Sequence, residues 1–174
     1  PIMNSIYCPA LNLNVSFAGN FRNICITSWF NLVRLSTLTG KTFGIWGLAF
    51  KPHTDDIREA PALYIIEELL AAGAKIKAFD PEAMDNVAKE FGERIQLCGD
   101  QNEALIDADA LIILTEWSVF RTPSFKVLRK LLNEHIIFDG RNLYSLDQMQ
   151  ELGFAYQSIG REKIALPAEA KVKA

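Results

Sequence analysis

The chain has 174 residues, of which 49% are hydrophobic and 22% charged, and its 18 basic and 21 acidic side chains give a net charge of −3. This length suits one globular domain with a real core, and the acidic balance excludes the basic surface of a nucleic-acid-binding protein. Its apolar runs fall short of the roughly 18 residues of a membrane span, and its three separated cysteines can build neither a disulfide framework nor a four-cysteine zinc site. We therefore expect a cytoplasmic protein that acts without nucleic acid or membrane.

Residues 1–39 differ in composition from the rest of the chain. Their charged side chains are Arg22 and Arg34, and they contain no Asp, Glu or Lys. Asparagines interrupt their apolar residues, which argues against a secretory signal, and the segment Ile24–Leu35 is compatible with a strand or a short buried helix. Three interpretations remain open: an arm that packs on a partner, a divergent structural element, or residues foreign to the natural protein. We assign no chemistry to this segment.

From residue 41 onward, strand and helix patterns alternate. The apolar run Phe43–Trp46 predicts a strand, and a polar loop follows over Lys51–Glu59. Pro61 suits a first helical turn, where its missing N–H leaves no bond unmade. The spacing of the apolar residues then predicts a helix over Ala62–Ala72, and a second strand is expected over Lys75–Phe79.

The alternation continues with shorter segments. Helical patterns are expected over Glu82–Phe91, Glu103–Asp107, Ser124–Leu132 and Ser145–Leu152. Strands are expected over Ile95–Cys98, Ala108–Leu114, Ile136–Phe138 and Phe154–Ile159. Apolar strands that alternate with helices are typical of a parallel sheet covered on both faces. We therefore predict an α/β fold over residues 40–161, a Rossmann-like, doubly wound, mainly parallel sheet with helices on both faces, followed by a flexible tail over 162–174.

Three of the predicted strands end in unusual polar sequences. These are Gly47–Arg58, Thr115–Trp117 and Asp139–Arg141. Because the carboxyl ends of parallel strands meet at one edge of a sheet, where ligands of this fold bind, these segments should converge on one site.

The loop after the first strand has the composition of an anion site, although it lacks the glycines of a dinucleotide fingerprint. Lys51 offers a point charge and Arg58 a planar fork of donors, close to the free N–H groups of the next helix. Phe50 is suited to flank a planar base or a sugar, and Asp55 and Asp56 to orient the cations or to cap the helix. The alternative is a solvated loop whose charges pair with one another.

Arg141 leaves open a similar choice. It is either a surface ion-pair partner or, at this edge of the fold, a clamp for phosphate or carboxylate. For Trp117 we expect a packing role with a hydrogen-bonded indole. His53 and His135 lack neighbouring ligands in the sequence, so we expect no metal site, and Cys98 is expected to be an inert thiol.

Four segments of the chain resemble a known family. They are GLAFKPHTDDIREAP (47–61), LTEWSVF (114–120), IFDGRNLY (137–144) and MQELGFAYQSIGR (149–161). In this order they are similar to the C-terminal, UDP-binding domain of the UDP-glucose 6-dehydrogenases, and the resemblance spans residues 38–161. The first segment is shared with dehydrogenases of UDP-N-acetylmannosamine and GDP-mannose, whereas the TEW and DGRN elements favour UDP-glucose.

The resemblance implies an NAD-dependent oxidoreductase of polysaccharide biosynthesis that converts UDP-glucose to UDP-glucuronate. It implies that Phe50, Lys51 and Arg141 contact the UDP-sugar, and that Arg58 reaches the NAD, which a preceding domain mainly holds. It also implies that the full-length enzyme is a homodimer or a higher homo-oligomer.

The sequence departs from the family at the reacting groups. The family's nucleophilic cysteine belongs to a G-G-x-C-F-P-K-D type motif, and neither that motif nor the nucleotide fingerprint occurs here. We therefore name no catalytic residue and expect the chain by itself to be inactive. Two alternatives remain open: the same domain of a UDP-N-acetylmannosamine or GDP-mannose dehydrogenase, and a non-catalytic nucleotide-binding or interaction module.

Overall fold

The computed structural model describes residues 6–8, 13–15 and 38–165 of the chain. Two short strands, β1 (Ile6–Cys8) and β2 (Leu13–Val15), pair antiparallel as a small sheet. The predicted segment Ile24–Leu35, like the part of the predicted tail after residue 165, lies outside the described residues. The stretch from residue 38 to residue 165 contains the α/β domain, and within it Ile164 forms an isolated bridge with Tyr156.

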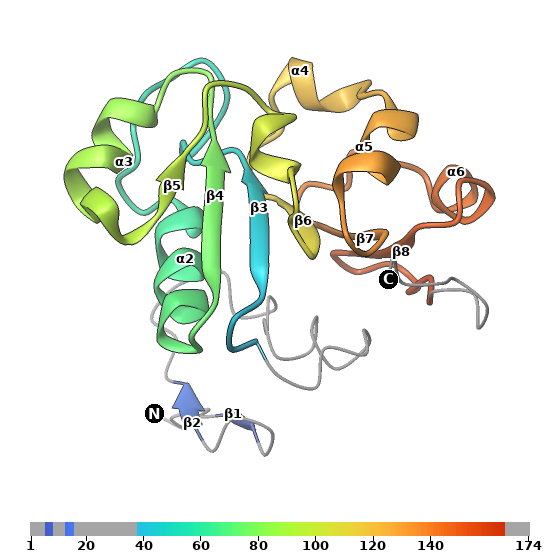
Figure 1. Cartoon of the computed structure of the whole chain (residues 1–174), viewed down its shortest axis with the longest axis horizontal. Coiled ribbons are helices and arrows are strands. Elements are labelled where there is room, and N and C mark those ends of the chain that lie inside the picture. Colours follow the sequence, from blue (N-terminus) through green and yellow to red (C-terminus); the bar gives the residue numbers. More distant parts are fainter. Residues whose placement is uncertain (1–5, 9–12, 16–37, 166–174) are drawn as a thin grey trace.

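A six-stranded parallel sheet forms the centre of this domain (Figure 1). Its strands are β3 (Thr42–Trp46), β4 (Lys75–Phe79), β5 (Gln96–Leu97), β6 (Ala110–Ile113), β7 (Ile136–Asp139) and β8 (Ala155–Ser158). Their spatial order is β5-β4-β3-β6-β7-β8, and every neighbouring pair is parallel. The chain thus runs outward from β3, returns to the other side of β3, and runs outward again. This is the predicted doubly wound arrangement.

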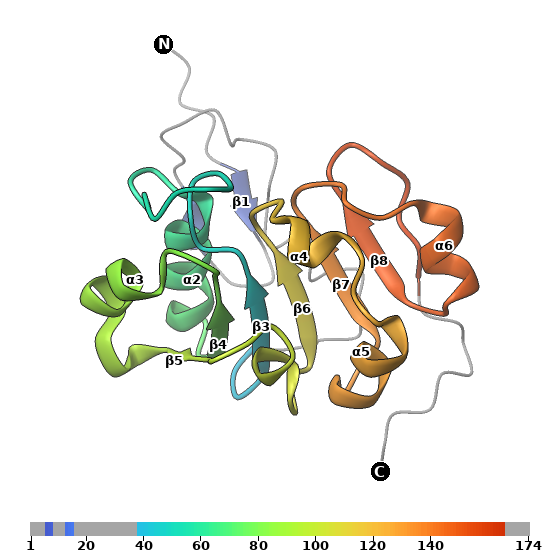
Figure 2. The same ribbon diagram turned by 90° about the horizontal axis from the view of Figure 1, so that it is seen from above.

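Helices cover the sheet in two groups (Figures 1 and 2). The helices are α2 (Pro61–Ala71), α3 (Met84–Phe91), α4 (Ser118–Arg121), α5 (Phe125–Leu131) and α6 (Leu146–Glu151). The first two lie over the β3–β5 half of the sheet and the others over the β6–β8 half. Right-handed crossovers put the two groups on opposite faces. Within the described residues no helix is long and apolar enough to cross a bilayer.

Each element predicted between residues 40 and 161 is present, with its ends within two residues of those expected. The expected helical pattern at Glu103–Asp107 is a 3₁₀ turn over Glu103–Leu105. Helix α4 was not predicted. It has four residues, of which Phe120 is buried, and one turn is too short to show a helical period.

Burial on both faces explains why the central strands are so apolar. The side chains of β6 and β7 are all at most 1% exposed, so neither face of these strands contacts water. At the end of β3, the Trp46 ring stacks on Phe120 with centroids 5.0 Å apart, and its indole N–H donates to the backbone oxygen of Gln101 at 2.7 Å. One aromatic side chain therefore joins β3, α4 and the loop before β6.

The strand order reverses where two backbones come very close. Gly47, directly after β3, has a φ of +90°, and a Cβ atom at this position would lie 2.6 Å from the backbone nitrogen of Thr115, which follows β6. Real Cβ atoms do not approach a backbone so closely, and L side chains rarely adopt this φ. Glycine is therefore required at this point for two independent reasons.

Replacing Gly47 by Ala should destabilise the domain by about 2–4 kcal/mol, because the methyl group adds a backbone clash to the strain of a positive φ. Gly160→Ala is the matched control, since Gly160 has a φ of +68° but a Cβ there would meet nothing within 4 Å. That change should cost only about 1 kcal/mol. Urea denaturation followed by circular dichroism measures both values, and equal losses would contradict the close approach of the two loops.

Candidate functional site

The loops after β3, β6 and β7 come together at the carboxyl edge of the sheet, the edge toward which the β3 and β4 arrows point in Figure 1. The parallel hydrogen bonding continues past the strand ends, since Leu114 donates to the Trp46 oxygen and Gly140 to the Ile113 oxygen, both at 2.9 Å. Between β3 and β6 the strand order reverses, and doubly wound sheets bind ligands outside such a crevice. The predicted convergence of the three segments is confirmed.

Asp80, directly after β4, fixes two of these loops. Its side chain is buried (1% exposed), and its Oδ2 accepts hydrogen bonds from the backbone N–H groups of Leu48 (2.6 Å) and Ala49 (3.0 Å). The same oxygen accepts the indole N–H of Trp117 at 3.0 Å. Its Oδ1 accepts two backbone N–H groups just before α3, both at 2.9 Å. The packing role predicted for Trp117 is confirmed, and Asp80 is the residue that gives it a partner.

Asp139, the last residue of β7, fixes the third loop in a similar way. Its Oδ1 accepts the backbone N–H of Arg141 at 2.8 Å, and its Oδ2 accepts the backbone N–H of Leu143 and the hydroxyl of Tyr156, both at 2.7 Å. Burial, together with the charge of Asp139, raises the pKa of Tyr156, so this phenol remains a hydrogen-bond donor. The backbone from which Arg141 projects is therefore held rigidly.

The side chain of Arg141 joins all three strand ends. Its Nε donates to the backbone oxygen of Leu114 at 2.7 Å, and its Nη2 donates to the backbone oxygen of Phe50 at 3.4 Å. The side chain is only 23% exposed. A guanidinium carries more N–H donors than these two bonds use, so the group is fixed in place with donors left for a ligand.

Glu116, in the loop after β6, lies against this guanidinium without bonding to it. Its Oε2 is 3.1 Å from the Nε of Arg141, yet this oxygen is covered and accepts no hydrogen bond. The two observations agree, because the single hydrogen of Nε points at the Leu114 oxygen. The contact is therefore an attraction between charges rather than a hydrogen-bonded pair.

Phe50 and Lys51 are exposed next to Arg141. The Phe50 ring is 44% exposed, and its backbone N–H donates to the backbone oxygen of Asp56 at 2.9 Å, which closes the loop after β3. Lys51 follows Phe50 in this loop, and it is exposed. The structure thus places the Arg141 guanidinium against the backbone of Phe50, and Lys51 is the next residue in the chain.

Arg58 belongs to the same loop, but its charge is already paired. Its Nε and Nη2 donate to the two carboxylate oxygens of Asp56 at 3.0 and 2.8 Å. These hydrogen bonds lower the pKa of Asp56 to about 2. The Arg58 side chain is nevertheless 88% exposed, so its outer side faces away from the domain. Of the two roles considered for Asp56, it orients a cation.

The start of α2 does not present its N–H groups to an anion. Ala60 at the N-cap and Ala62 in the first turn are 0% and 1% exposed, and Pro61 between them has no N–H. No side chain caps this helix. Asp55 instead ties the loop to α3, because the amide of Asn86 donates to its backbone and carboxylate oxygens at 2.9 and 3.2 Å. The side chains of the loop, rather than the helix end, carry the positive charge of the site.

Three residues that the sequence analysis set aside have local partners. Cys98 is 2% exposed, and burial raises the pKa of its thiol, as expected of an inert cysteine. His53 packs edge-on against the Trp117 ring at 5.5 Å between centroids, and a ring nitrogen of His135 lies 3.1 Å from the backbone oxygen of Arg129. No group of three or more His, Cys, Asp or Glu side chains in the described part of the chain is placed to hold a metal ion.

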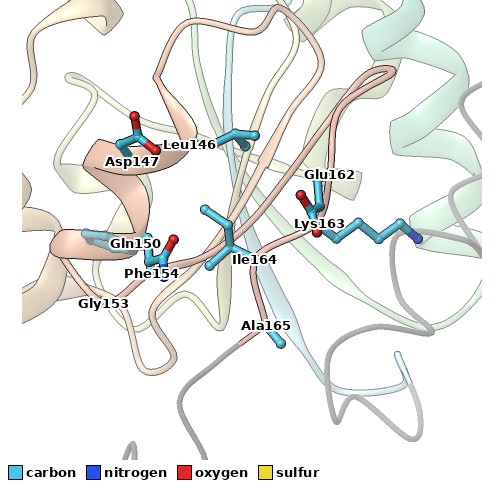
Figure 3. A pocket seen from close by; sticks show the side chains of 9 residues that line it. All are labelled: Leu146, Asp147, Gln150, Gly153, Phe154, Glu162, Lys163, Ile164 and Ala165. Atoms are coloured by element: carbon cyan, nitrogen blue, oxygen red, sulfur yellow. The ribbon is translucent and has the colours of Figure 1, made fainter.

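A separate hollow lies beside α6 and the segment that follows β8 (Figure 3). Figure 3 shows Ile164 pointing into it and Lys163 pointing away. Its lining residues are Leu146, Asp147, Gln150, Gly153, Phe154, Glu162, Lys163, Ile164 and Ala165. None of them belongs to the group of residues at the strand ends, which we call the strand-end cluster and which remains the candidate site. Its members are Phe50, Lys51, Asp56, Arg58, Glu116 and Arg141. Sequence reasoning missed Asp80, although its position between an apolar strand and Pro81 is a signal for a loop-organising carboxylate.

Comparisons with known proteins identify the family of this domain. A family model described as the UDP binding domain of the UDP-glucose/GDP-mannose dehydrogenase family matches residues 44–146, which include the strand-end cluster. The chain is 46% identical to the UDP-glucose 6-dehydrogenase of Pseudomonas aeruginosa over 129 residues, which are 71% of this chain and 28% of that protein. The chain thus spans less than a third of the length of this relative.

Two solved structures have a similar fold. A UDP-glucose dehydrogenase from Pyrobaculum islandicum matches with a TM-score of 0.55 and 31% identity, over 62% of this chain and 23% of that one. An NDP-N-acetyl-D-galactosaminuronic acid dehydrogenase from Methanosarcina mazei matches with a TM-score of 0.59 and 25% identity, over 72% of this chain and 26% of that one. Both similarities cover a minor part of a longer protein.

Asp80→Asn should destabilise the domain by about 2–4 kcal/mol, because the amide replaces an acceptor oxygen with a donor that faces N–H groups. The matched control is Asp85→Asn on α3, where the side chain is exposed and the loss should stay below about 1 kcal/mol. Urea denaturation followed by tryptophan fluorescence measures both. A loss for Asp80→Asn no larger than the control's would show that Asp80 does not organise the loops.

Arg58→Ala should raise the pKa of Asp56 from about 2 toward the ordinary value of 3.8, because the carboxylate loses both guanidinium donors and its counter-charge and keeps only the backbone N–H of residue 58. A carboxyl whose pKa is lowered by folding stabilises the fold above its unfolded pKa, and that contribution is lost as the pH falls through the folded pKa. Here the window runs from about 4 down to about 2.

Carboxyl-carbon NMR between about pH 5 and pH 3 checks this expectation. The Asp56 signal should stay nearly constant in the unaltered protein and titrate in Arg58→Ala. Arg94→Ala, which removes an arginine paired with Glu67 instead, should leave the Asp56 signal as it was. A strongly titrating Asp56 in the unaltered protein would refute the ion pair.

Proposed function

Because the chain belongs to the UDP-glucose/GDP-mannose dehydrogenase family, whose UDP binding domain it contains, we propose that the strand-end cluster binds the diphosphate of a UDP-sugar. Arg141 and Lys51 supply positive charge, and Phe50 flanks the base or the sugar. The observation that carries the proposal is the Arg141 guanidinium, which the Leu114 and Phe50 oxygens hold in place with donors to spare.

A guanidinium held in this way is well suited to a phosphate. Its planar fork matches two oxygens of a phosphate at once, and a group that is already fixed loses little conformational entropy when the ligand arrives. Lys51 complements it as an exposed, adjustable point charge. The two cations approach the ligand from the loops after β7 and β3, on either side of the crevice at the strand reversal.

For the whole protein we propose the activity of a UDP-glucose 6-dehydrogenase. In that reaction the C6 alcohol of UDP-glucose becomes the carboxylate of UDP-glucuronate, with one water consumed and two hydrides transferred to two molecules of NAD in succession. The similarity to the Pseudomonas aeruginosa enzyme supports UDP-glucose as the sugar nucleotide. We assign no catalytic residue to the described part of the chain, and we place the enzyme in the cytoplasm as a homo-oligomer.

Arg58 is the residue that we propose to reach the NAD. Its side chain is 88% exposed and is oriented by Asp56, so one side of the guanidinium is available to a group outside this domain. The sequence contains no dinucleotide fingerprint, so the NAD would be held mainly by another part of the enzyme. When bound, NAD supplies the hydride acceptor, and Arg58 would contribute only a contact to it.

A dehydrogenase for an N-acetylated UDP-sugar is the second candidate, and the similarity to the Methanosarcina mazei enzyme supports it. The substrate of a GDP-mannose dehydrogenase differs from a UDP-sugar in its purine base. The two cations, Lys51 and Arg141, would contact the diphosphate that all these ligands share, so the base and the sugar have to be tested by binding. A non-catalytic interaction module would bind none of them.

Isothermal titration at low salt should show UDP binding that weakens about tenfold in Lys51→Ala and in Arg141→Ala, because each removes a charged contact to phosphate. Lys75→Ala is the matched control, since Lys75 is exposed at the start of β4, on the opposite edge of the sheet. Its affinity for UDP should stay unchanged.

Each outcome of these titrations separates two candidates. Tighter binding of GDP than of UDP would support the GDP-mannose alternative. Folded protein that binds neither nucleotide would support the non-catalytic module. An Arg141→Ala variant with undiminished affinity for UDP would show that the ligand binds elsewhere.

A further inference from the structure

Glu116 is a carboxylate in the candidate site that the proposed binding of phosphate does not use. Its Oε2 lies 3.1 Å from the Nε of Arg141, is covered by other atoms, and accepts no hydrogen bond. Covering a carboxylate oxygen without giving it a donor is costly. A charge kept in such a position acts on its neighbours through its electric field.

Arg141 does not depend on Glu116 for its position. Its backbone N–H is held by Asp139, and its guanidinium donates to the Leu114 and Phe50 oxygens. Removing the charge of Glu116 would leave all of these hydrogen bonds in place. The effect of Glu116 is therefore on the charge of the site rather than on its geometry.

The cations of the site are largely compensated. Asp56 pairs with Arg58, and Glu116 lies against Arg141. Among the described residues of this cluster, Lys51 is the cation that has no carboxylate within salt-bridge distance. Asp55 and Glu59 add two negative charges on the same loop, so the formal charges around the site nearly balance. The Glu116 side chain is 34% exposed, so its field reaches a ligand that binds to Arg141, and it repels each negative charge of that ligand.

We propose that Glu116 is a specificity-determining residue that disfavours free UDP relative to UDP-sugars. This inference rests on the proposed function of the site. The terminal phosphate of UDP loses a second proton with a pKa of about 6, so UDP carries about three negative charges at neutral pH. Esterification by a sugar removes this ionisation and leaves about two. Because the repulsion grows with the charge of the ligand, Glu116 weakens the binding of UDP more than that of UDP-glucose.

The selectivity would keep the site open for sugar-bearing nucleotides when free UDP is also present. A more positive site would bind UDP more tightly than a UDP-sugar on charge alone, since the fold supplies the same guanidinium to both. Glu116 offsets that preference at the guanidinium to which the diphosphate is proposed to bind.

Titration of UDP and UDP-glucose into Glu116→Gln tests the proposal, because glutamine keeps the shape and removes the charge. Both affinities should rise, that for UDP by about tenfold and that for UDP-glucose by about threefold, so the ratio of the two affinities shifts about threefold toward UDP. A contact that only one of the two ligands makes contributes equally in the variant and in the unaltered protein. It therefore cancels when the two affinity ratios are compared, as in a double-mutant cycle. Raising the salt concentration should shrink the shift.

Three further variants support the comparison. Glu116→Asp keeps the charge and should retain most of the original ratio, and Glu116→Ala provides a second neutral variant if Glu116→Gln does not fold. Glu151→Gln, at the exposed end of α6, changes the net charge equally at a remote position and should leave the ratio unchanged.

An unchanged ratio in both neutral variants, with both ligands bound, would overturn the proposal. So would weaker binding of both ligands in Glu116→Gln, which would mean that the carboxylate holds Arg141 in place. Failure of the unaltered protein to bind either ligand would instead overturn the proposed function, and with it this inference. The two failures are therefore distinguishable in one set of titrations.

Discussion

The buried carboxylate of Asp80 holds the candidate site in shape. Its two oxygens accept five hydrogen bonds, from the loop after β3, from the indole of Trp117 after β6, and from the start of α3. A buried carboxylate requires such donors, because burial removes the water that would otherwise solvate it. The segments that supply the donors therefore cannot shift independently. Asp139 fixes the loop after β7 in the same way, by accepting backbone N–H groups of that loop.

Positive charges gather at this edge, although the chain as a whole is acidic. The net charge of −3 describes the whole chain, whereas the ligand that we propose at the strand reversal would meet Arg141 and Lys51. Carboxylates lie in contact with two of the cations, Asp56 with Arg58 and Glu116 with Arg141. Carboxylates placed in this way weaken the attraction of the site for anions in general. The shape of a ligand and the number of its negative charges would then determine how tightly it binds.

Much of the fold was predictable because its signals are local. Apolar runs of strand length, the helical spacing after Pro61 and the punctuating glycines each lie within a few residues, and the elements they predicted are present. The misses also have physical reasons. Helix α4 is a single turn without a period to detect, and the N–H groups at the start of α2 are made inaccessible by packing that involves residues distant in the chain.

By itself, the sequence determined the class of fold, the order of its elements and the edge at which charged residues would gather, because hydrophobic periodicity and the rules of parallel sheets act along the chain. Only the tertiary structure decided which charges are paired and which donors remain. The bond from Asp80 to Leu48 spans 32 residues, and that from Arg141 to Phe50 spans 91. Partners so far apart in the chain come into contact only after the sheet has formed. No local sequence pattern therefore shows whether the guanidinium of Arg141 donates to a carbonyl oxygen or to a carboxylate.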